Sequence, residues 1–316
     1  MENANAIEVR NLVKGYKGVP VLQDVSFTVE RGTVFALLGA NGSGKTTTIN
    51  ILTTLIKPDG GTASVAGFDV TQQPVAVRDQ ISLTGQFAAV DQVLTARENL
   101  VLMGDLRHVP DPEGIAADLL DQFDLEAAAD RRLLTFSGGM RRRLDIAMSL
   151  VGDAPIIFFD EPTTGLDPKS RIDMWLTIRQ LVENGATVFL TTQYLDEADR
   201  LADAVAILHG GRIVATGTPE QLKAMVPTGF VELEFADDAQ LAAAQAELGA
   251  RHDVNRVGSK LVVATTGSVA EMAEMFIQLK ETGIEPTGFS SQLPTLDDVF
   301  FKILDGDKED LRASAH

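Results

Sequence analysis

The sequence contains no cysteine, so disulfide bonds and thiolate-ligated metal sites are excluded. Positive charge is also scarce. The 27 lysines and arginines stand against 45 aspartates and glutamates, and the net charge of −18 argues against a nucleic-acid-binding surface. No apolar run approaches the ~20 residues that cross a bilayer, and residues 1–6 lack both the positive region and the apolar core of a secretion signal. We therefore expect a soluble, cytoplasmic protein of one large or two ordinary domains.

The most informative feature that is present is a glycine-rich segment, Gly39–Thr46. It follows the apolar run Thr33–Leu38, which predicts a buried strand, and it leads into Thr47–Leu52, which predicts the start of a helix. Glycines let main-chain N–H groups converge on phosphate oxygens, and a helix N-terminus favours the same anion. Lys45 adds a charge for the β- and γ-phosphates, and Thr46 adds a hydroxyl for Mg²⁺. An ordinary glycine turn needs neither side chain, so the segment predicts a phosphate-binding loop.

In residues 1–225, short β-rich runs alternate with longer helical patterns, which predicts an α/β domain with a mainly parallel sheet. The strands that we expect there are Ile7–Val9, Val25–Val29, Val34–Leu38, Ile81–Thr84, Ile156–Asp160, Thr187–Thr191 and Val205–Leu208. From about residue 88 to residue 150 the chain is instead rich in Leu, Ala, Asp and Arg at helical spacing, with breaks at Pro110, Pro112 and Gly138. This stretch predicts a helical insertion, or subdomain.

Residues 226–316 form a second, small α+β domain in this interpretation. Phe230–Phe235 alternates with a period of two, as a half-buried strand does. The further elements that we expect are the helix Gln240–Leu248, the strand Lys260–Ala264, the helix Val269–Glu281, the strand Gly288–Ser291 and the helix Leu296–Leu304. The polar tail, residues 305–316, is expected to fray.

Two acids end the predicted strand Ile156–Glu161. We expect this strand to run beside the phosphate-loop strand, where Asp160 reaches Mg²⁺ directly or through water. Glu161 faces the other way and can orient or deprotonate an attacking water molecule. A solvated pair of acids at a strand end is the competing interpretation, and the preceding phosphate loop disfavours it.

A second glycine turn, Ser137-Gly138-Gly139, precedes a predicted helix shortly before these acids. Serine at a helix start, followed by glycines, favours anion binding, although a plain helix cap has the same pattern. We interpret the next residues, Arg141–Arg143, as one solvated face of the helix that pairs with acids of the insertion. Trp175 lies in a helical run and is expected to pack in the core.

Taken in order, these motifs resemble the nucleotide-binding subunit of an ATP-binding cassette (ABC) transporter, over residues 7–222. The resemblance implies a RecA-like P-loop NTPase domain with a helical subdomain. It identifies the following segments: Gly39–Thr46 as Walker A, Ser137–Gly139 as the signature motif, Phe158–Glu161 as Walker B, Gly165–Asp167 as the D-loop, Gln86 as the Q-loop glutamine and Tyr16, ahead of the first hairpin, as the aromatic residue that stacks on adenine. Six motifs in one order are far more specific than any one of them.

The resemblance also assigns roles to single residues. The expected nucleotide contacts are Tyr16, Gly39, Ala40, Asn41, Gly42, Ser43, Gly44, Lys45, Thr46, Thr47, Ser137, Gly138, Gly139 and Asp167. The expected Mg²⁺ contacts are Thr46, Gln86 and Asp160, and the expected catalytic residues are Lys45, Gln86, Glu161 and Gln193. For Tyr16, packing as an ordinary loop aromatic is the competing interpretation.

One position departs from the family pattern. Gln193 stands where the family usually has a histidine, and none of the four histidines is nearby in the sequence. Glutamine can donate a hydrogen bond to a γ-phosphate oxygen, but it cannot carry a positive charge or shuttle a proton. We therefore assign water activation to Glu161 and a positioning role to Gln193.

The segments Thr84–Ala88, Ser137–Arg143, Thr191–Asp199 and Pro294–Phe300 narrow the resemblance to the daunorubicin/doxorubicin-resistance subfamily, which is of the ABC-2 exporter type. This implies hydrolysis of ATP to energise export of a drug, antibiotic or lipid-like substrate through a separate membrane permease, on the cytoplasmic face of the membrane. It further implies a head-to-tail pair of such domains, with each ATP held by Walker A of one subunit and the signature turn of the other. A homodimer would have two similar ATP sites.

Three other interpretations remain open. A soluble ABC-type ATPase acting on ribosomes or DNA usually carries two cassettes or large inserted arms, whereas this chain has one cassette and an acidic balance. The domain after residue 226 could bind a regulatory ligand, although we favour a dimer-stabilising role. A nucleotide kinase would share the phosphate loop but would leave the two segments Ser137–Gly139 and Gly165–Asp167 unexplained.

Overall fold

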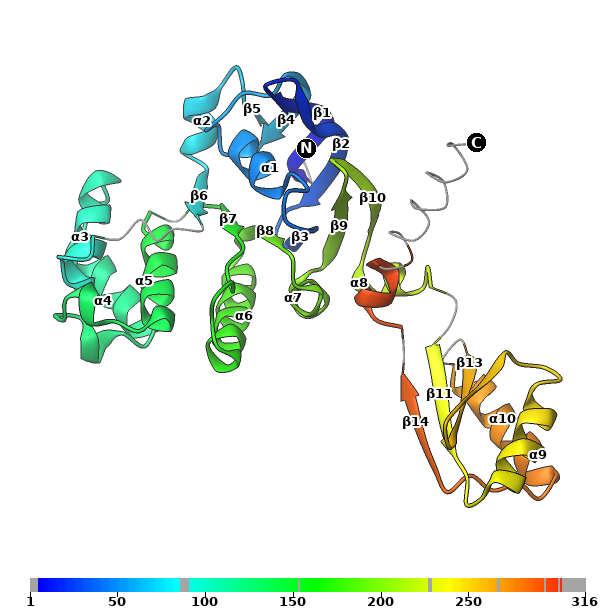
Figure 1. The fold of residues 1–316 in the computed structure, drawn as a ribbon. Coiled ribbons are helices and arrows are strands. Elements are labelled where there is room, and N and C mark those ends of the chain that lie inside the picture. The colour runs from blue at the N-terminus through cyan, green and yellow to red at the C-terminus, as the bar shows by residue number, and fades with distance from the viewer. Residues whose placement is uncertain are drawn as a thin grey trace. The chain divides into compact units, whose positions relative to one another are not determined.

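The computed structural model describes residues 5–85, 91–152, 154–226, 229–265, 268–292, 294–300 and 302. The chain divides into two compact units, Met1–Pro219 and Glu220–His316, a few residues before the boundary expected from the sequence (Figure 1). Within the described ranges, no helix combines the length and the apolar character that a membrane span requires.

A six-stranded sheet forms the centre of the first unit. Its strands, in order across the sheet, are β10 (Arg212–Gly217), β9 (Ala204–His209), β3 (Val34–Leu38), β8 (Thr187–Thr192), β7 (Ile156–Asp160) and β6 (Ile81–Thr84). All neighbours are parallel except the antiparallel pair β9–β10. Every residue of β3, β7 and β8 is buried, as expected of parallel strands that are covered on both faces.

The prediction that the strand ending in Asp160 runs beside the phosphate-loop strand was wrong. β7 does not run beside β3, because β8 lies between them and pairs with both. All three strands are short apolar runs, so their composition does not reveal which one is in the middle. The consequence for the site is that Thr191, near the end of β8, lies between the phosphate loop and the acids at the end of β7.

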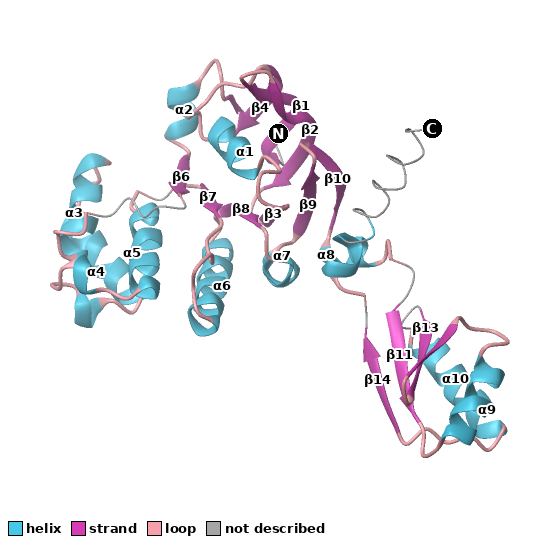
Figure 2. Ribbon diagram, viewed as in Figure 1, coloured by secondary structure: helices cyan, strands magenta, loops and turns pink. Residues whose placement is uncertain are grey.

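A second, antiparallel sheet packs in the same unit (Figure 2). Its strands, in order, are β2 (Val19–Glu30), β1 (Asn5–Tyr16), β4 (Gly60–Val65) and β5 (Phe68–Asp69). Phe27 of this sheet lies 5.2 Å, between ring centroids, from Phe35 of the central sheet, and Phe189 lies 5.5 Å from Phe35. The hydrophobic core that these rings join also contains apolar residues of α1 (Lys45–Leu52). The helix that follows the phosphate loop is therefore anchored by its apolar side chains.

The predicted helical insertion consists of three helices and two short 3₁₀ turns, and Figure 1 shows it gathered beyond the edge strand β6. The helices are α3 (Ala96–Leu106), α4 (Pro112–Gln122) and α5 (Gly138–Leu150). The helix α3 begins with a capping box, in which Glu98 N donates to Thr95 Oγ1 at 3.2 Å and Thr95 N donates to Glu98 Oε2 at 2.7 Å. The remaining helices of this unit are α2 (Pro74–Arg78), α6 (Pro168–Glu183) and α7 (Leu195–Leu201).

A four-stranded antiparallel sheet and the helices α9 (Asp238–Leu248) and α10 (Val269–Glu281) form the body of the second unit. The strands, in order, are β12 (Val254–Val257), β13 (Lys260–Thr265), β11 (Gly229–Glu234) and β14 (Gly288–Gln292). Alternate residues of β11 and β13 join apolar residues of both helices in a small core. Residues 296–300 are helical, and α8 (Pro219–Lys223) lies at the junction of the two units. The strand β12 was not expected from the sequence.

Candidate nucleotide site

The glycine-rich loop connects β3 to α1 through a backbone that only glycine fits at two positions. At Gly39 a Cβ atom would lie 2.5 Å from Leu208 O, closer than a real Cβ approaches any atom. Gly44 has φ +112°, and a Cβ there would lie 2.5 Å from the Leu22 side chain. The loop therefore has the tight turn and open main chain that phosphate binding requires.

Lys45 is held over this loop by three oxygen atoms. Its ammonium group donates to Gly39 O at 2.8 Å and to Ala40 O at 3.2 Å, and it lies 3.2 Å from Glu161 Oε1. The side chains of Lys45 and Glu161 are only 4% and 9% exposed. A buried ammonium beside a phosphate-binding turn is suited to pairing with anionic oxygens. The structure thus brings together the two expected catalytic groups from Walker A and Walker B.

The oxygen atoms that could hold Mg²⁺ also meet here. Thr46 Oγ1 lies 3.4 Å from Asp160 Oδ1, which also accepts a 2.6 Å hydrogen bond from Thr191 Oγ1. A hydroxyl and a carboxylate are ligands that Mg²⁺ prefers, with water and phosphate oxygens completing its shell. Across the described part of the chain, no group of three or more His, Cys, Asp or Glu side chains could hold a metal ion by itself. The donor set therefore fits Mg²⁺ bound together with a nucleotide.

Glu161 has a backbone conformation that a residue with a side chain rarely adopts. Its φ of +51° lies in the left-handed region. Its N–H donates to both Thr191 O and Thr191 Oγ1, at 3.1 Å each. Thr164 N donates to Glu161 O at 3.3 Å, and Thr164 Oγ1 donates to Glu161 Oε2 at 3.2 Å. Such strain persists only where several contacts fix it, and it clusters at functional sites.

The signature turn occupies the N-terminus of α5. Ser137 caps the helix by accepting a 3.3 Å hydrogen bond from Met140 N, and both Ser137 and Gly138 are exposed. Asp167 caps α6 in the same way, and hydrogen bonds from Ser170 and Lys169 hold the pKa of its carboxyl below the ordinary value. Figure 1 shows α5 set apart from α1. Within one chain, the phosphate loop and the expected signature turn therefore lie at the starts of two different helices.

Three expected site residues need separate comment. We predicted that Tyr16 precedes the first hairpin, and this was wrong. Tyr16 is the last residue of β1 and pairs with Val19 inside the β1–β2 hairpin. The residue is 45% exposed, with Lys14 Nζ 5.6 Å from the ring centroid, so packing leaves much of it accessible. Gln193 follows β8 directly and is half-buried. Gln86 lies outside the described residues.

The interpretation of the arginine cluster was wrong about the solvated face. Arg142 is largely buried, with 11% of its side chain exposed, and it forms a 2.9 Å ion pair with Asp145, an acid of the insertion. Arg143 does pair with an acid of the insertion, Asp124, at 3.4 Å. Consecutive helical residues point about 100° apart, so three in a row cannot share one solvated face. That periodicity was the signal in the sequence that would have separated Arg142 from its neighbours.

A second buried charge was not identified from the sequence. Glu197 of α7 is fully buried and accepts a 3.2 Å hydrogen bond from Trp175 Nε1, which ties the expected core tryptophan to this acid. Burial raises the pKa of the Glu197 carboxyl, and the hydroxyls of Thr192 and Thr163 partly oppose that rise. Thr192 immediately precedes Gln193, so this acid lies behind one wall of the candidate site.

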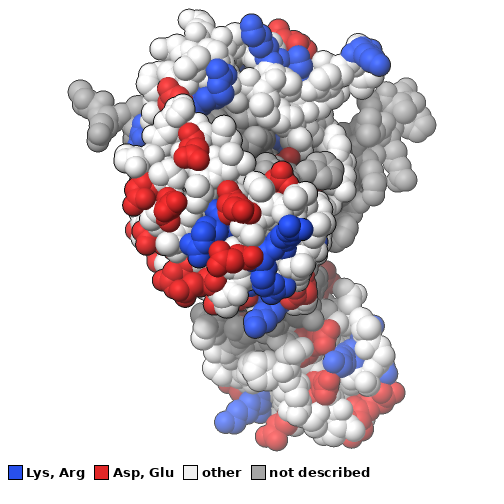
Figure 3. Space-filling view, turned by 90° about the vertical axis from the view of Figure 1, so that its left-hand side faces the viewer, with Lys and Arg blue, Asp and Glu red and all other residues white. Residues whose placement is uncertain are grey.

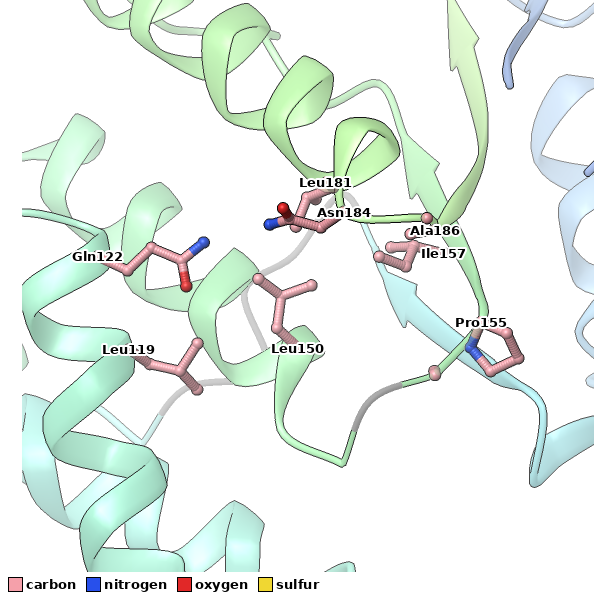
Figure 4. Close-up of a pocket in the computed structure, with 10 residues that line it drawn as sticks. Leu119, Gln122, Leu150, Pro155, Ile157, Leu181, Asn184 and Ala186 are labelled. Carbon is pink, nitrogen blue, oxygen red and sulfur yellow. The ribbon is translucent and has the colours of Figure 1, made fainter. Parts of the chain in front are cut away.

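A separate pocket of about 360 Å³ lies between the insertion, the C-terminal end of α6 and the N-terminal end of β7 (Figure 4). Leu119 and Gln122 of α4 face Leu150 of α5 and Asn184 after α6 across it. None of its ten lining residues is acidic, basic or nucleophilic. It therefore offers no chemistry for hydrolysis.

A mainly parallel sheet with a phosphate loop, a buried lysine and two acids at the end of a nearby strand defines a P-loop nucleoside triphosphatase. The family model for the ABC transporter matches residues 22–164. The daunorubicin/doxorubicin resistance ATP-binding protein DrrA of Streptomyces peucetius is 45% identical over 303 residues, which cover 94% of this chain and 92% of that protein. The Nod factor export ATP-binding protein I of Sinorhizobium fredii is 34% identical and covers 96% and 88% of the two chains. The chain belongs to the ATP-binding subunits of ABC transporters and is an ATPase.

Solved structures agree with this assignment. The structure of an ATP-binding subunit of an ABC transporter has a TM-score of 0.63 at 32% identity, over 70% of this chain and 92% of that chain. A dimeric ATP-binding cassette in a post-hydrolysis state, bound to ADP and phosphate, has a TM-score of 0.62 at 25% identity, over 67% of this chain and 98% of that chain. The predicted P-loop fold is therefore confirmed.

Proposed function

We propose that this chain hydrolyses Mg²⁺-ATP to energise export of a drug, antibiotic or lipid-like molecule through a separate membrane permease of the ABC-2 type. The observation that carries the proposal is the nearly buried ion pair of Lys45 with Glu161, together with the contact between Thr46 and Asp160, around one glycine-rich loop. Support for export comes from relatives whose names describe drug resistance and Nod factor export. In transport the chain would act on the cytoplasmic face of the membrane.

Each residue of the candidate site has a distinct task in this proposal. The loop amides and Lys45 bind the phosphates, and the exposed Tyr16 ring stacks on adenine. Thr46 and Asp160 hold Mg²⁺, together with Gln86, and the ion neutralises charge on the phosphates. Glu161 accepts a proton from the attacking water, because its carboxylate lies beside Lys45 at the phosphate end of the loop. Gln193 donates a hydrogen bond to the γ-phosphate and carries no proton.

The signature turn makes the proposed function depend on a pair of subunits. Ser137 and Gly138 are exposed at the N-terminus of α5, where free N–H groups and the helix dipole favour an anion. We propose that they bind the ATP held by the phosphate loop of a second copy, next to Asp167. Because ATP then contacts both subunits only in the closed pair, its binding favours closure and hydrolysis weakens it.

A role on nucleic acid receives no support from the surface charge. The insertion exposes a series of acids: Asp91, Glu98, Asp105, Asp111, Glu113, Asp118, Asp121, Asp124, Glu126 and Asp130. Figure 3 views the side of the first unit that bears the insertion and shows acidic side chains gathered on it. Such a face repels phosphate backbones.

The variant Lys45→Ala tests the phosphate-binding site. Loss of a charge-assisted contact worth about 1.5–3 kcal/mol should weaken ATP binding by roughly tenfold or more. Titration of the full chain with Mg²⁺-ATP, followed by calorimetry, measures this change. Lys57→Ala, at an exposed lysine after α1, is the matched control and should bind ATP as the unsubstituted chain does. Equal affinity of the Lys45→Ala variant would contradict the proposed site.

A further inference from the structure

Arg142 connects the signature helix to the turn that follows Glu161. Its Nε donates to Pro162 O at 3.0 Å, and its Nη1 donates to Gly85 O at 2.9 Å and to Asp145 Oδ2 at 2.9 Å. One guanidinium group therefore contacts α5, the end of β6 and the turn after β7. These three segments carry the signature motif, the position before the Q-loop glutamine and the water-activating acid.

The turn that Arg142 contacts is the one that holds Glu161 in its left-handed conformation. From the β8 side, Thr191 fixes the Glu161 amide, and Thr164 fixes its carbonyl and carboxylate. The carbonyl of the next residue, Pro162, accepts a hydrogen bond from Arg142. The strained backbone is thus held from two directions, and the insertion supplies one of them.

The chemistry of the side chain suits this task. The planar guanidinium group offers donors in fixed, diverging directions, which let it reach two carbonyl oxygens and a carboxylate together. The buried Asp145 carboxylate balances its charge at the low exposure of this position. A lysine ammonium keeps the charge but cannot reproduce this fork, the planar set of diverging N–H donors.

We propose that Arg142 is a positioning residue, which fixes Glu161 for activation of the attacking water and makes the placement of this acid follow the placement of α5. The inference rests on the proposed function, in which Glu161 activates water and the N-terminus of α5 binds the ATP of a second subunit. Closure around ATP on the signature turn is then transmitted to the acid of the other site through one side chain.

Two variants of the full chain test this role. Arg142→Lys preserves the charge beside Asp145 and removes the fork. Arg142→Met alone would leave the Asp145 charge without its ion pair, so the second variant is the double change Arg142→Met/Asp145→Leu, which makes the position apolar. Arg143→Met is the matched control, because the partners of Arg143 among the described residues, Phe123 O and Asp124, lie within the insertion.

We expect both Arg142 variants to bind Mg²⁺-ATP with unchanged Kd and KM and to lose about tenfold in kcat, because misplacing a reacting group is costly. Hydrogen exchange should rise in a peptide that covers residues 156–166 and not in the phosphate loop. In single-turnover experiments, the same Arg142 changes should have no further effect when Glu161→Gln is already present, because Arg142 acts through that acid. The Arg143→Met control should retain its kcat.

Two results would overturn the inference. One is an unchanged kcat in either folded Arg142 variant, whether or not KM rises. The other is a loss of rate from the Arg142 change that is equally large in the unsubstituted chain and in the Glu161→Gln variant. The same set of measurements keeps the inference apart from the proposed function. If Glu161→Gln alone hydrolyses ATP at the normal rate, the assignment of Glu161 fails. If that variant is slow while the Arg142 variants are normal, only the role of Arg142 fails.

Discussion

Glu197 is an acid that the fold removes from water. Its carboxyl lies behind β8, next to Trp175 and to the threonine hydroxyls that flank the candidate site. Burial disfavours the charged form, so the pKa of Glu197 lies above its ordinary value of 4.5. The folded chain therefore holds the proton of Glu197 more tightly than the unfolded chain does.

This difference predicts how Glu197→Gln changes the pH dependence of stability. The contribution of Glu197 is fully present below pH 4.5, its unfolded value, and is lost as the pH rises through the raised pKa. The glutamine variant has no such titration. We expect its free energy of unfolding, relative to that of the unsubstituted chain, to rise as the pH increases above 4.5. Urea unfolding at several pH values, followed by the fluorescence of the single tryptophan, measures it.

The exposed acid Asp118 provides the control for this prediction, because Asp118→Asn removes a carboxylate from the surface of α4. The free energy of unfolding of the Asp118→Asn variant should show the same pH dependence as that of the unsubstituted chain. A glutamine variant at Glu197 with that same dependence would show that this carboxyl does not titrate differently in the folded state.

At the scale of elements, continuous apolar or amphipathic runs were predicted well and partly exposed strands were predicted poorly. The bounds of β3, β6, β7 and α10 are those expected, because each is a continuous apolar or amphipathic run. The strands β4, β5, β10 and β12 were missed. They are partly exposed, and their pairing with neighbouring strands rather than their own composition makes them strands.

The capping box of α3 supports a prediction at this scale. Thr95→Ala removes the acceptor for Glu98 N and should lower the free energy of unfolding of the first unit by about 1 kcal/mol. The fluorescence of Trp175, which belongs to this unit, reports its unfolding. Thr95→Ser keeps the oxygen and should lose much less, with ATP hydrolysis unchanged in both variants. Equal losses in the two variants would exclude the cap as the cause.

At the scale of the whole molecule, the proposed function makes the site of one chain incomplete. The Walker A and Walker B residues meet within it, whereas the signature turn points outward at the start of another helix. The proposed pair of subunits completes both ATP sites at once. A change that preserves ATP binding and slows hydrolysis should therefore trap the pair.

Glu161→Gln is that change. We expect hydrolysis to slow about 10²-fold or more, because the general base is lost while the phosphate contacts remain. With saturating Mg²⁺-ATP, the variant should sediment as a dimer in analytical ultracentrifugation, and with ADP as a monomer. Adding Lys45→Ala should abolish the ATP-dependent dimer. A Glu161→Gln variant that stays monomeric with bound ATP would refute the shared site.

The sequence by itself determined the phosphate loop, the strand that ends in Asp160 and Glu161 and the family, because these depend on residue types at short, fixed spacings. The conformation of Gly39–Thr46, for example, follows from glycines between a strand and a helix. Only the tertiary structure decided that β8 separates β3 from β7 and that Arg142 reaches Pro162. Both depend on contacts between segments far apart in the chain, where many pairings are compatible with the same apolar or charged residues and packing selects one.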